Sequence, residues 1–172
     1  MCMTKRASTL VAVLLGCLGA TVSSAQTPAV VAAALKDLTS MCTDAGGKPL
    51  AADAVKRADL NADGKEDYVL DGGSVGCEGF ASLYGDREKG VTVYVGDGKG
   101  GAKQAFSDMT YGMKIEGEGP AAKVWLTTSG AGCGKKQAAD FASEAFCERA
   151  IAWNAKTQLF DYAPVSTVKM IE

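Results

Sequence analysis

Short apolar runs of period two, separated by glycine-rich turns, fill the chain from about residue 54 onward and restrict the folds open to it. The clearest run spans residues 91–95, and residues 68–70, 111–115 and 123–127 show the same character. Alternating side chains point to opposite faces of a strand, and glycine-rich turns join neighbouring strands. The pattern therefore predicts a mainly antiparallel sheet built of hairpins.

One helix is predicted before the sheet. Thr27 is suited to cap it, and Pro28 is suited to its first position, where a missing N–H is harmless. Gly46 and Gly47 are expected to end it. Its apolar residues recur at helical spacing on one stripe: Val31, Leu35, Leu38 and Met41.

Two further elements are expected near the C-terminus. Residues 137–146 are interpreted as a short helix, and residues 150–162 as a hairpin turning at 154–157. Pro164 discourages continuation of the last strand. The amino-acid composition does not change along the chain, and no long linker interrupts it. The chain is therefore predicted to be one α+β domain, with the N-terminal helix packed on the sheet.

The first 25 residues have the features of a secretory signal peptide. Lys5 and Arg6 precede an apolar run at 10–16, and Ser23-Ser24-Ala25 resembles a cleavage site. Cleavage there leaves residues 26–172 as a single domain in the periplasm or outside the cell. Residues 14–17 also resemble a lipobox, so a lipoprotein anchored at Cys17 remains the alternative.

Charge and hydropathy narrow the class of partner. The formal net charge is −2, and removal of Lys5 and Arg6 makes it more negative. A mildly acidic surface argues against nucleic acid, which attracts clustered positive charge. No long apolar segment follows the signal, so no transmembrane segment is expected in the mature chain. The expected partner is an unidentified protein or envelope component.

Four cysteines remain after cleavage. An even number in an exported chain indicates two disulfides. Of three possible connectivities, Cys42–Cys77 and Cys133–Cys147 are favoured, because each pair closes a loop-rich, glycine-rich stretch. A zinc site is disfavoured by the lack of histidine and of CxxC spacing.

An acidic loop at residues 59–67 carries the strongest chemical signal. Oxygen-bearing side chains occupy positions one, three, five and nine, glycine occupies position six, and Lys65 at position seven offers its backbone carbonyl. Hard oxygen ligands favour calcium, while magnesium demands stricter octahedral geometry. An acidic Asx–Gly turn without a metal is the alternative. The candidate ligands are Asp59, Asn61, Asp63, Lys65 and Asp67.

The loop resembles the D-x-N-x-D-G-x-x-D calcium loops of FG-GAP and VCBS-type repeats, found in integrin-like propellers and many secreted bacterial proteins. Residues 91–101 look like the strand and turn that follow such loops, with Phe106 where an aromatic closes the unit. The resemblance covers residues 55–106 once, and the Phe-Gly and Gly-Ala-Pro signatures are missing. It implies a calcium loop joining two strands, not a propeller. Leu70 at position twelve excludes an EF-hand.

These features favour an exported, non-enzymatic calcium-binding module with a structural or interaction role. One alternative is an envelope inhibitor or adaptor whose loop only supports the fold. Another is a cell-wall hydrolase that acts through Glu116 or Glu118. The glycines and proline around these residues indicate a solvent-exposed turn, which disfavours this alternative. The absence of histidine excludes Ser-His-Asp catalysis.

Two weaker patterns remain. Trp125 and Trp153 are candidate stacking platforms for sugars, although sheet packing is the commoner role of tryptophan. Gly96-x-Gly98-x-x-Gly101 matches a dinucleotide fingerprint, but no helical stripe follows it, so a glycine-rich turn is predicted there.

Overall fold

Helix α1 (Ala29–Asp44) precedes eleven strands in the part of the chain that the computed structural model describes, residues 26–171. Short 3-10 turns lie between them: η1 (Gly72–Ser74), η2 (Gly119–Ala121), η3 (Gly130–Cys133), η4 (Phe141–Ser143) and η5 (Val165–Thr167). The strands are β1 (Lys48–Leu50), β2 (Val55–Ala58), β3 (Asp67–Asp71), β4 (Gly76–Glu78), β5 (Lys89–Gly96), β6 (Ala102–Thr110), β7 (Gly112–Glu116), β8 (Lys123–Ser129), β9 (Phe146–Asn154), β10 (Leu159–Tyr162) and β11 (Lys169–Met170).

Every strand pairing between these residues is antiparallel. One sheet has the order β2-β3-β5-β6, and a second has the order β10-β9-β8-β7, with β11 paired to β9. Strands β1 and β4 form a separate pair. The predicted α+β class, the strands around residues 68–70 and 91–95, and the β9–β10 hairpin are confirmed.

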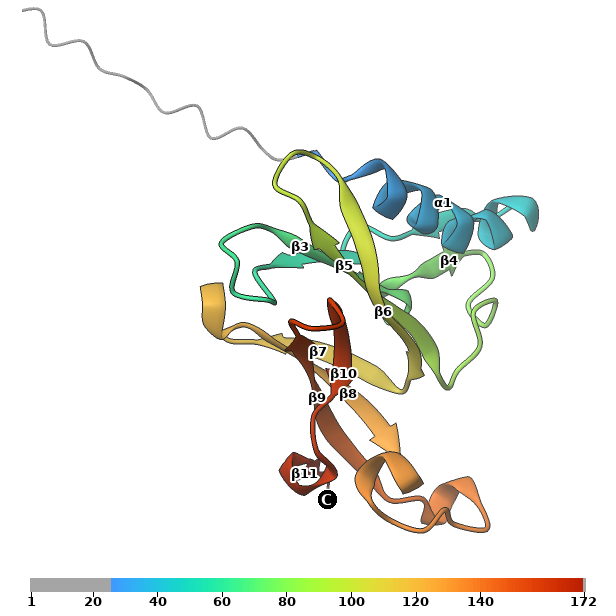
Figure 1. Cartoon of the computed structure of the whole chain (residues 1–172). Coiled ribbons are helices and arrows are strands. Elements are labelled where there is room, and N and C mark those ends of the chain that lie inside the picture. The colour runs from blue at the N-terminus through green and yellow to red at the C-terminus, as the bar shows by residue number, and fades with distance from the viewer. Residues whose placement is uncertain (1–25, 172) are drawn as a thin grey trace, which may run out of the picture.

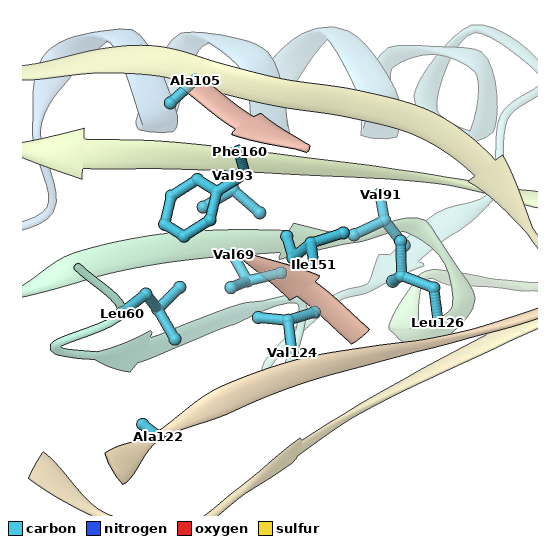
Figure 2. Packing of buried hydrophobic residues seen from close by; sticks show 10 residues of the cluster. All are labelled: Leu60, Val69, Val91, Val93, Ala105, Ala122, Val124, Leu126, Ile151 and Phe160. Atoms are coloured by element: carbon cyan, nitrogen blue, oxygen red, sulfur yellow. The ribbon is translucent and has the colours of Figure 1, made fainter. Parts of the chain in front are cut away.

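The main core lies between the two sheets. Val69, Val91 and Val93 project from the first sheet, and Val124 and Leu126 project from the second; all five are at most 1% exposed. Figure 2 shows these side chains meeting between the layers. Burying an aliphatic side chain of this size stabilises the fold by about 1.5–3 kcal/mol. Apolar packing between two sheets therefore holds the halves of the chain together.

Helix α1 covers the outer face of the first sheet (Figure 1). Tyr68 and Leu70 face the helix while Val69, between them, faces the second sheet, so β3 is buried along its whole length. The predicted helix stripe is partly right. Val31 is fully buried, but Met41 is 49% exposed, because the neighbouring residue, Cys42, turns inward.

The start of the helix differs from the prediction. The capping residue is Pro28 rather than Thr27, and no side chain caps the helix. The Thr27 hydroxyl instead accepts a hydrogen bond from Arg57 Nη2 at 2.9 Å. The end agrees with expectation, since the chain leaves the helix through Gly46 at φ +82°.

The helix predicted over residues 137–146 is wrong. Asp140 accepts a hydrogen bond from Ser143 N and caps only the short turn η4. Phe146 already belongs to β9, paired with Ser129. Phe141 and Phe146 contact Tyr111, with ring centroids 5.8 and 5.0 Å away, so aromatic packing fixes this segment in an irregular form.

Both predicted disulfides are confirmed. Cys42 of α1 is bonded to Cys77 of β4, and Cys133 of η3 is bonded to Cys147 of β9. Two disulfides fit a protein of an oxidising compartment. None of the helices in residues 26–171 is long and apolar enough to cross a membrane. The predicted signal peptide and the lipobox at Cys17 lie outside the described residues.

Candidate metal site

The acidic loop connects the adjacent antiparallel strands β2 and β3. Ala58 pairs with Asp67 at its base, so the intervening residues form a closed hairpin loop. Ala62 at position four has φ +61°, and Gly64 at position six has φ +77°. Left-handed backbone costs a residue with a side chain about 1–2 kcal/mol. Two such turns within three residues wrap the loop tightly.

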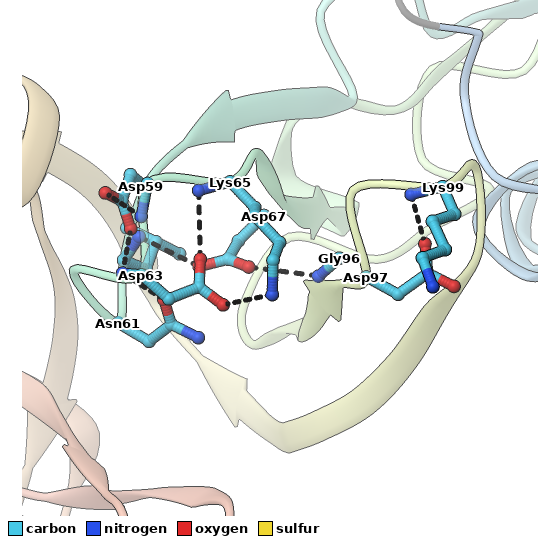
Figure 3. A network of polar contacts seen from close by, with 10 residues as sticks. Asp59, Asn61, Asp63, Lys65, Asp67, Gly96, Asp97 and Lys99 are labelled. Atoms are coloured by element: carbon cyan, nitrogen blue, oxygen red, sulfur yellow. Dashed lines mark hydrogen bonds and ion pairs between the residues drawn. The ribbon is translucent and has the colours of Figure 1, made fainter.

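Three loop side chains turn their oxygens toward the loop's own backbone (Figure 3). Asp59 accepts hydrogen bonds from Asp63 N at 3.1 Å and Gly64 N at 3.0 Å. Asn61 Oδ1 also accepts from Asp63 N, at 3.0 Å. Oxygens of Asp59 and Asn61, at positions one and three, thus point to the same backbone amide, that of Asp63.

Asp67 at position nine lies deeper than the other members and is fully buried. Its Oδ2 accepts from Leu60 N at 2.9 Å, and its Oδ1 accepts from Gly96 N at 3.0 Å. The carboxylate therefore ties the loop to the end of β5, which lies 29 residues further along the chain. Gly96 is a member of this site that sequence reasoning missed.

Gly96 must be a glycine for a steric reason. A Cβ at this position would overlap the carbonyl oxygen of Glu66. The close approach of the two backbones is what brings the Gly96 amide within reach of Asp67. A conspicuous glycine at the end of a long apolar strand was the only signal in the sequence.

The carboxylates in the loop influence one another electrostatically. Burial raises the pKa of Asp67 above its ordinary value of 3.8, although its two amide hydrogen bonds oppose that shift. The negative charges of Asp63 and Asp59 raise the same pKa further. Ionised Asp67 is thus held close to two other acidic groups, an arrangement that a bound cation would stabilise.

Lys65 supplies the positive charge nearest to these acids. Its Nζ lies 3.1 Å from Asp63 Oδ2, and its backbone N–H donates to Asp63 Oδ1 at 2.9 Å. Partial burial tends to raise the pKa of Asp63. Hydrogen bonds from Lys65 and Asn61, together with the charge of Lys65, outweigh burial and lower this pKa below its ordinary value. One exposed ammonium thus neutralises part of the loop's charge.

The oxygen donors of the loop are of the kind that a hard cation takes, but they lie further apart than the ligands of a bound metal ion. Carboxylate, carboxamide and backbone carbonyl oxygens are the ligands that calcium takes. Within residues 26–171, no three acidic or cysteine side chains are gathered closely enough to hold a metal ion. Each oxygen of Asp67 already accepts one amide and retains a second lone pair. Metal binding at this loop would therefore require its acidic side chains to move closer together.

The other candidates from the sequence lie elsewhere. Glu116 is on β7, where its carboxylate lies 2.8 Å from both Lys114 Nζ and Lys169 Nζ. Hydrogen bonds from these two lysines lower its pKa, whereas a glycosidase acid needs a raised one. Glu118 is exposed beyond the end of β7. Within residues 26–171, neither glutamate forms a hydrogen bond or ion pair with a residue of the acidic loop, although Gly119, next to Glu118, lines a shallow pocket beside it.

The two tryptophans and the glycine motif are also accounted for. Trp125 is half-buried beneath Lys169 Nζ, 3.7 Å from the ring centroid. Trp153 packs on Phe160 with a centroid distance of 5.1 Å. The segment from Gly96 to Gly101 is the β5–β6 turn, followed by a strand and not by a helix, so the predicted glycine-rich turn is confirmed.

Comparisons with known proteins add no relative. No protein-family model matches the chain, and neither does a curated protein or a solved structure. The fold and the loop define the class: a disulfide-bonded α+β protein with an acidic hairpin loop. Function has to be inferred from that loop and its surroundings.

Proposed function

We propose that loop 59–67 binds one calcium ion, and that the protein is an exported structural or interaction module without catalytic activity. The ligands in this proposal are the side chains of Asp59, Asn61, Asp63 and Asp67 and the backbone carbonyl of Lys65. Calcium is a hard cation whose two positive charges would offset most of the charge of the three carboxylates and fix the loop against β3 and β5.

The clustering of negative charge at Asp67 is the observation that carries this proposal. Asp67 is completely buried, and its pKa is raised by burial and by its acidic neighbours. A structural turn needs no such concentration of carboxylates, because one Asx side chain is enough to close it. The left-handed Ala62 adds strain that a tightly held ion would offset.

Thermal unfolding of the oxidised protein, with calcium or with a chelator, tests the proposal. Calcium at about one hundred times its dissociation constant should add about 2.7 kcal/mol to the free energy of unfolding. For a domain of this size, that corresponds to roughly 5–10 °C in Tm. Magnesium at the same concentration should give a smaller rise.

Two variants with the same loss of charge make the result specific. Asp63→Ala removes a ligand and a charge from the loop and should abolish the calcium-dependent rise in Tm. Asp86→Ala removes an exposed carboxylate outside the loop and should keep that rise. An unchanged Tm in the wild-type protein, or an equal rise in Asp63→Ala, would reject the calcium site.

A further inference from the structure

A cleft of about 550 Å³ adjoins the acidic loop. Three segments far apart in the sequence form it: the loop itself, the β5–β6 hairpin and the β9–β10 hairpin. Figure 3 shows the β5–β6 turn, with Asp97, lying beside the loop. The side chains that matter most on its walls are Asp63, Asp97, Lys103, Trp153 and Gln158.

The cleft presents polar groups that the fold itself does not use. Within residues 26–171, the side chains of Gln158 and Lys103 form no hydrogen bond or ion pair, and both are exposed. The indole N–H of Trp153 likewise finds no acceptor among these residues, and Trp153 is only half-buried. Residues that line one cleft thus carry a carboxamide, an ammonium and an indole with their hydrogen-bonding capacity available.

Gln158 is held in an unfavourable backbone conformation. Its φ is +56°, and its N–H donates to Asn154 O at 2.8 Å to close the β9–β10 turn. This left-handed position favours glycine or asparagine. Gln158 and Ala62 are the only non-glycine residues with positive φ in the described part of the chain, and each lies in a segment that forms the cleft.

The composition of the walls indicates the chemistry of a ligand. The lining residues include two carboxylates, Asp63 and Asp97, and two ammonium groups, Lys65 and Lys103, so neither an anion nor a cation is favoured. Hydroxyl groups suit such a mixture, because each one both donates and accepts. Val95, Ala105 and Trp153 supply the apolar part of the surface, against which the C–H face of a sugar ring can pack.

We propose that this cleft binds a neutral saccharide, with Trp153 packing against a sugar ring and Gln158 hydrogen bonding its hydroxyl groups. This inference goes beyond the calcium-binding role and does not require the ion. Lys103 and Asp97 add polar groups from the β5–β6 hairpin.

NMR titration of the ¹⁵N-labelled, oxidised protein tests the proposal directly. The probes are three neutral trisaccharides: the N-acetylglucosamine trimer, cellotriose and maltotriose. At least one should produce a saturable shift of the Trp153 indole N–H signal at about millimolar concentration. The Trp125 indole, which lies under Lys169 outside the cleft, is the internal control and should not shift.

Gln158→Gly separates binding from folding. Glycine suits the left-handed turn, so the variant should melt at or above the wild-type temperature. It lacks the carboxamide, so its affinity for the trisaccharide should fall about fivefold or more. Thr157→Ala alters the same turn outside the cleft and should bind as the wild type does.

Three results would overturn the proposal. The first is the absence of any Trp153 shift with all three sugars at about 10 mM. The second is wild-type affinity in Gln158→Gly. The third is a Trp153 shift produced by inorganic phosphate but by none of the sugars, since that would make the cleft an anion site. Repeating the titration with chelator keeps the test independent of the calcium site.

Discussion

Removal of the buried carboxylate at Asp67 should destabilise the fold strongly, even without any metal. The side chain is completely buried and satisfies two backbone amides, Leu60 N at 2.9 Å and Gly96 N at 3.0 Å. Each buried amide left without an acceptor costs about 1–3 kcal/mol. Relief of the desolvated charge offsets part of this loss. We therefore expect Asp67→Ala to lose about 3–4 kcal/mol.

Asp67→Asn provides an intermediate case. The carboxamide keeps one acceptor oxygen but turns a donor toward the second amide, so we expect about half the loss of Asp67→Ala. Urea denaturation of the oxidised proteins in chelator measures both values and removes any contribution from calcium. Asp86→Ala, an exposed control, should change stability by no more than about 0.5 kcal/mol. A loss below about 1 kcal/mol in Asp67→Ala would refute the role assigned to this carboxylate.

Two further predictions concern other positions. Gly96→Ala should lower the free energy of unfolding by about 2 kcal/mol or more in the same assay, because the added Cβ overlaps the Glu66 carbonyl oxygen. Gly76→Ala is the control. Its Cβ would lie 3.6 Å from Leu50, so its stability should change little. Burial, and then a hydrogen bond to Asp108, raise the pKa of Tyr162 above its ordinary value of 10.0. Folded protein therefore keeps this proton where the unfolded chain loses it, so stability should fall as pH rises above about 10. Tyr162→Phe should show a shallower fall in alkaline denaturation, and an unchanged slope would contradict this assignment.

The parts of the fold that sequence could predict are those with a strong local pattern. Residues 91–95 alternate cleanly and form the centre of β5. The β9–β10 hairpin has two apolar runs around a polar turn, and it forms as expected. Both disulfides were predicted correctly from the loop-rich, glycine-rich stretch that each pair closes.

Strand β6 was missed because a bulge interrupts its alternation. Val93 pairs with Phe106 while Tyr94 pairs with Gln104, so Ala105 has no partner. The extra residue lets the adjacent side chains of Ala105 and Phe106 both contact the core. A period-two search does not recognise a strand in which neighbours point the same way.

The candidate site was predicted in its local part only. The alternate spacing of Asp59 and Asn61 is a local pattern, and in the structure an oxygen of each accepts a hydrogen bond from Asp63 N. The position of Asp67 depends on Gly96, which is adjacent only after β3 and β5 have paired. The cleft depends in the same way on a third segment, the β9–β10 hairpin. Contacts of this range leave no pattern in a single sequence.

The division of the chain between its sheets has a consequence for oxidative folding. The four-stranded sheet uses residues 55–110, the second sheet begins at Gly112, and neither disulfide among the described residues joins one sheet to the other. The bonded cysteines are 35 and 14 residues apart in the sequence. Each thiol is therefore nearer in sequence to its native partner than to a cysteine of the other disulfide, and closing the shorter loop costs less entropy. If the chain is exported N-terminus first, as its predicted signal peptide implies, Cys42 and Cys77 can form their disulfide before Cys133 and Cys147 emerge. The order of emergence would then favour the native pairing.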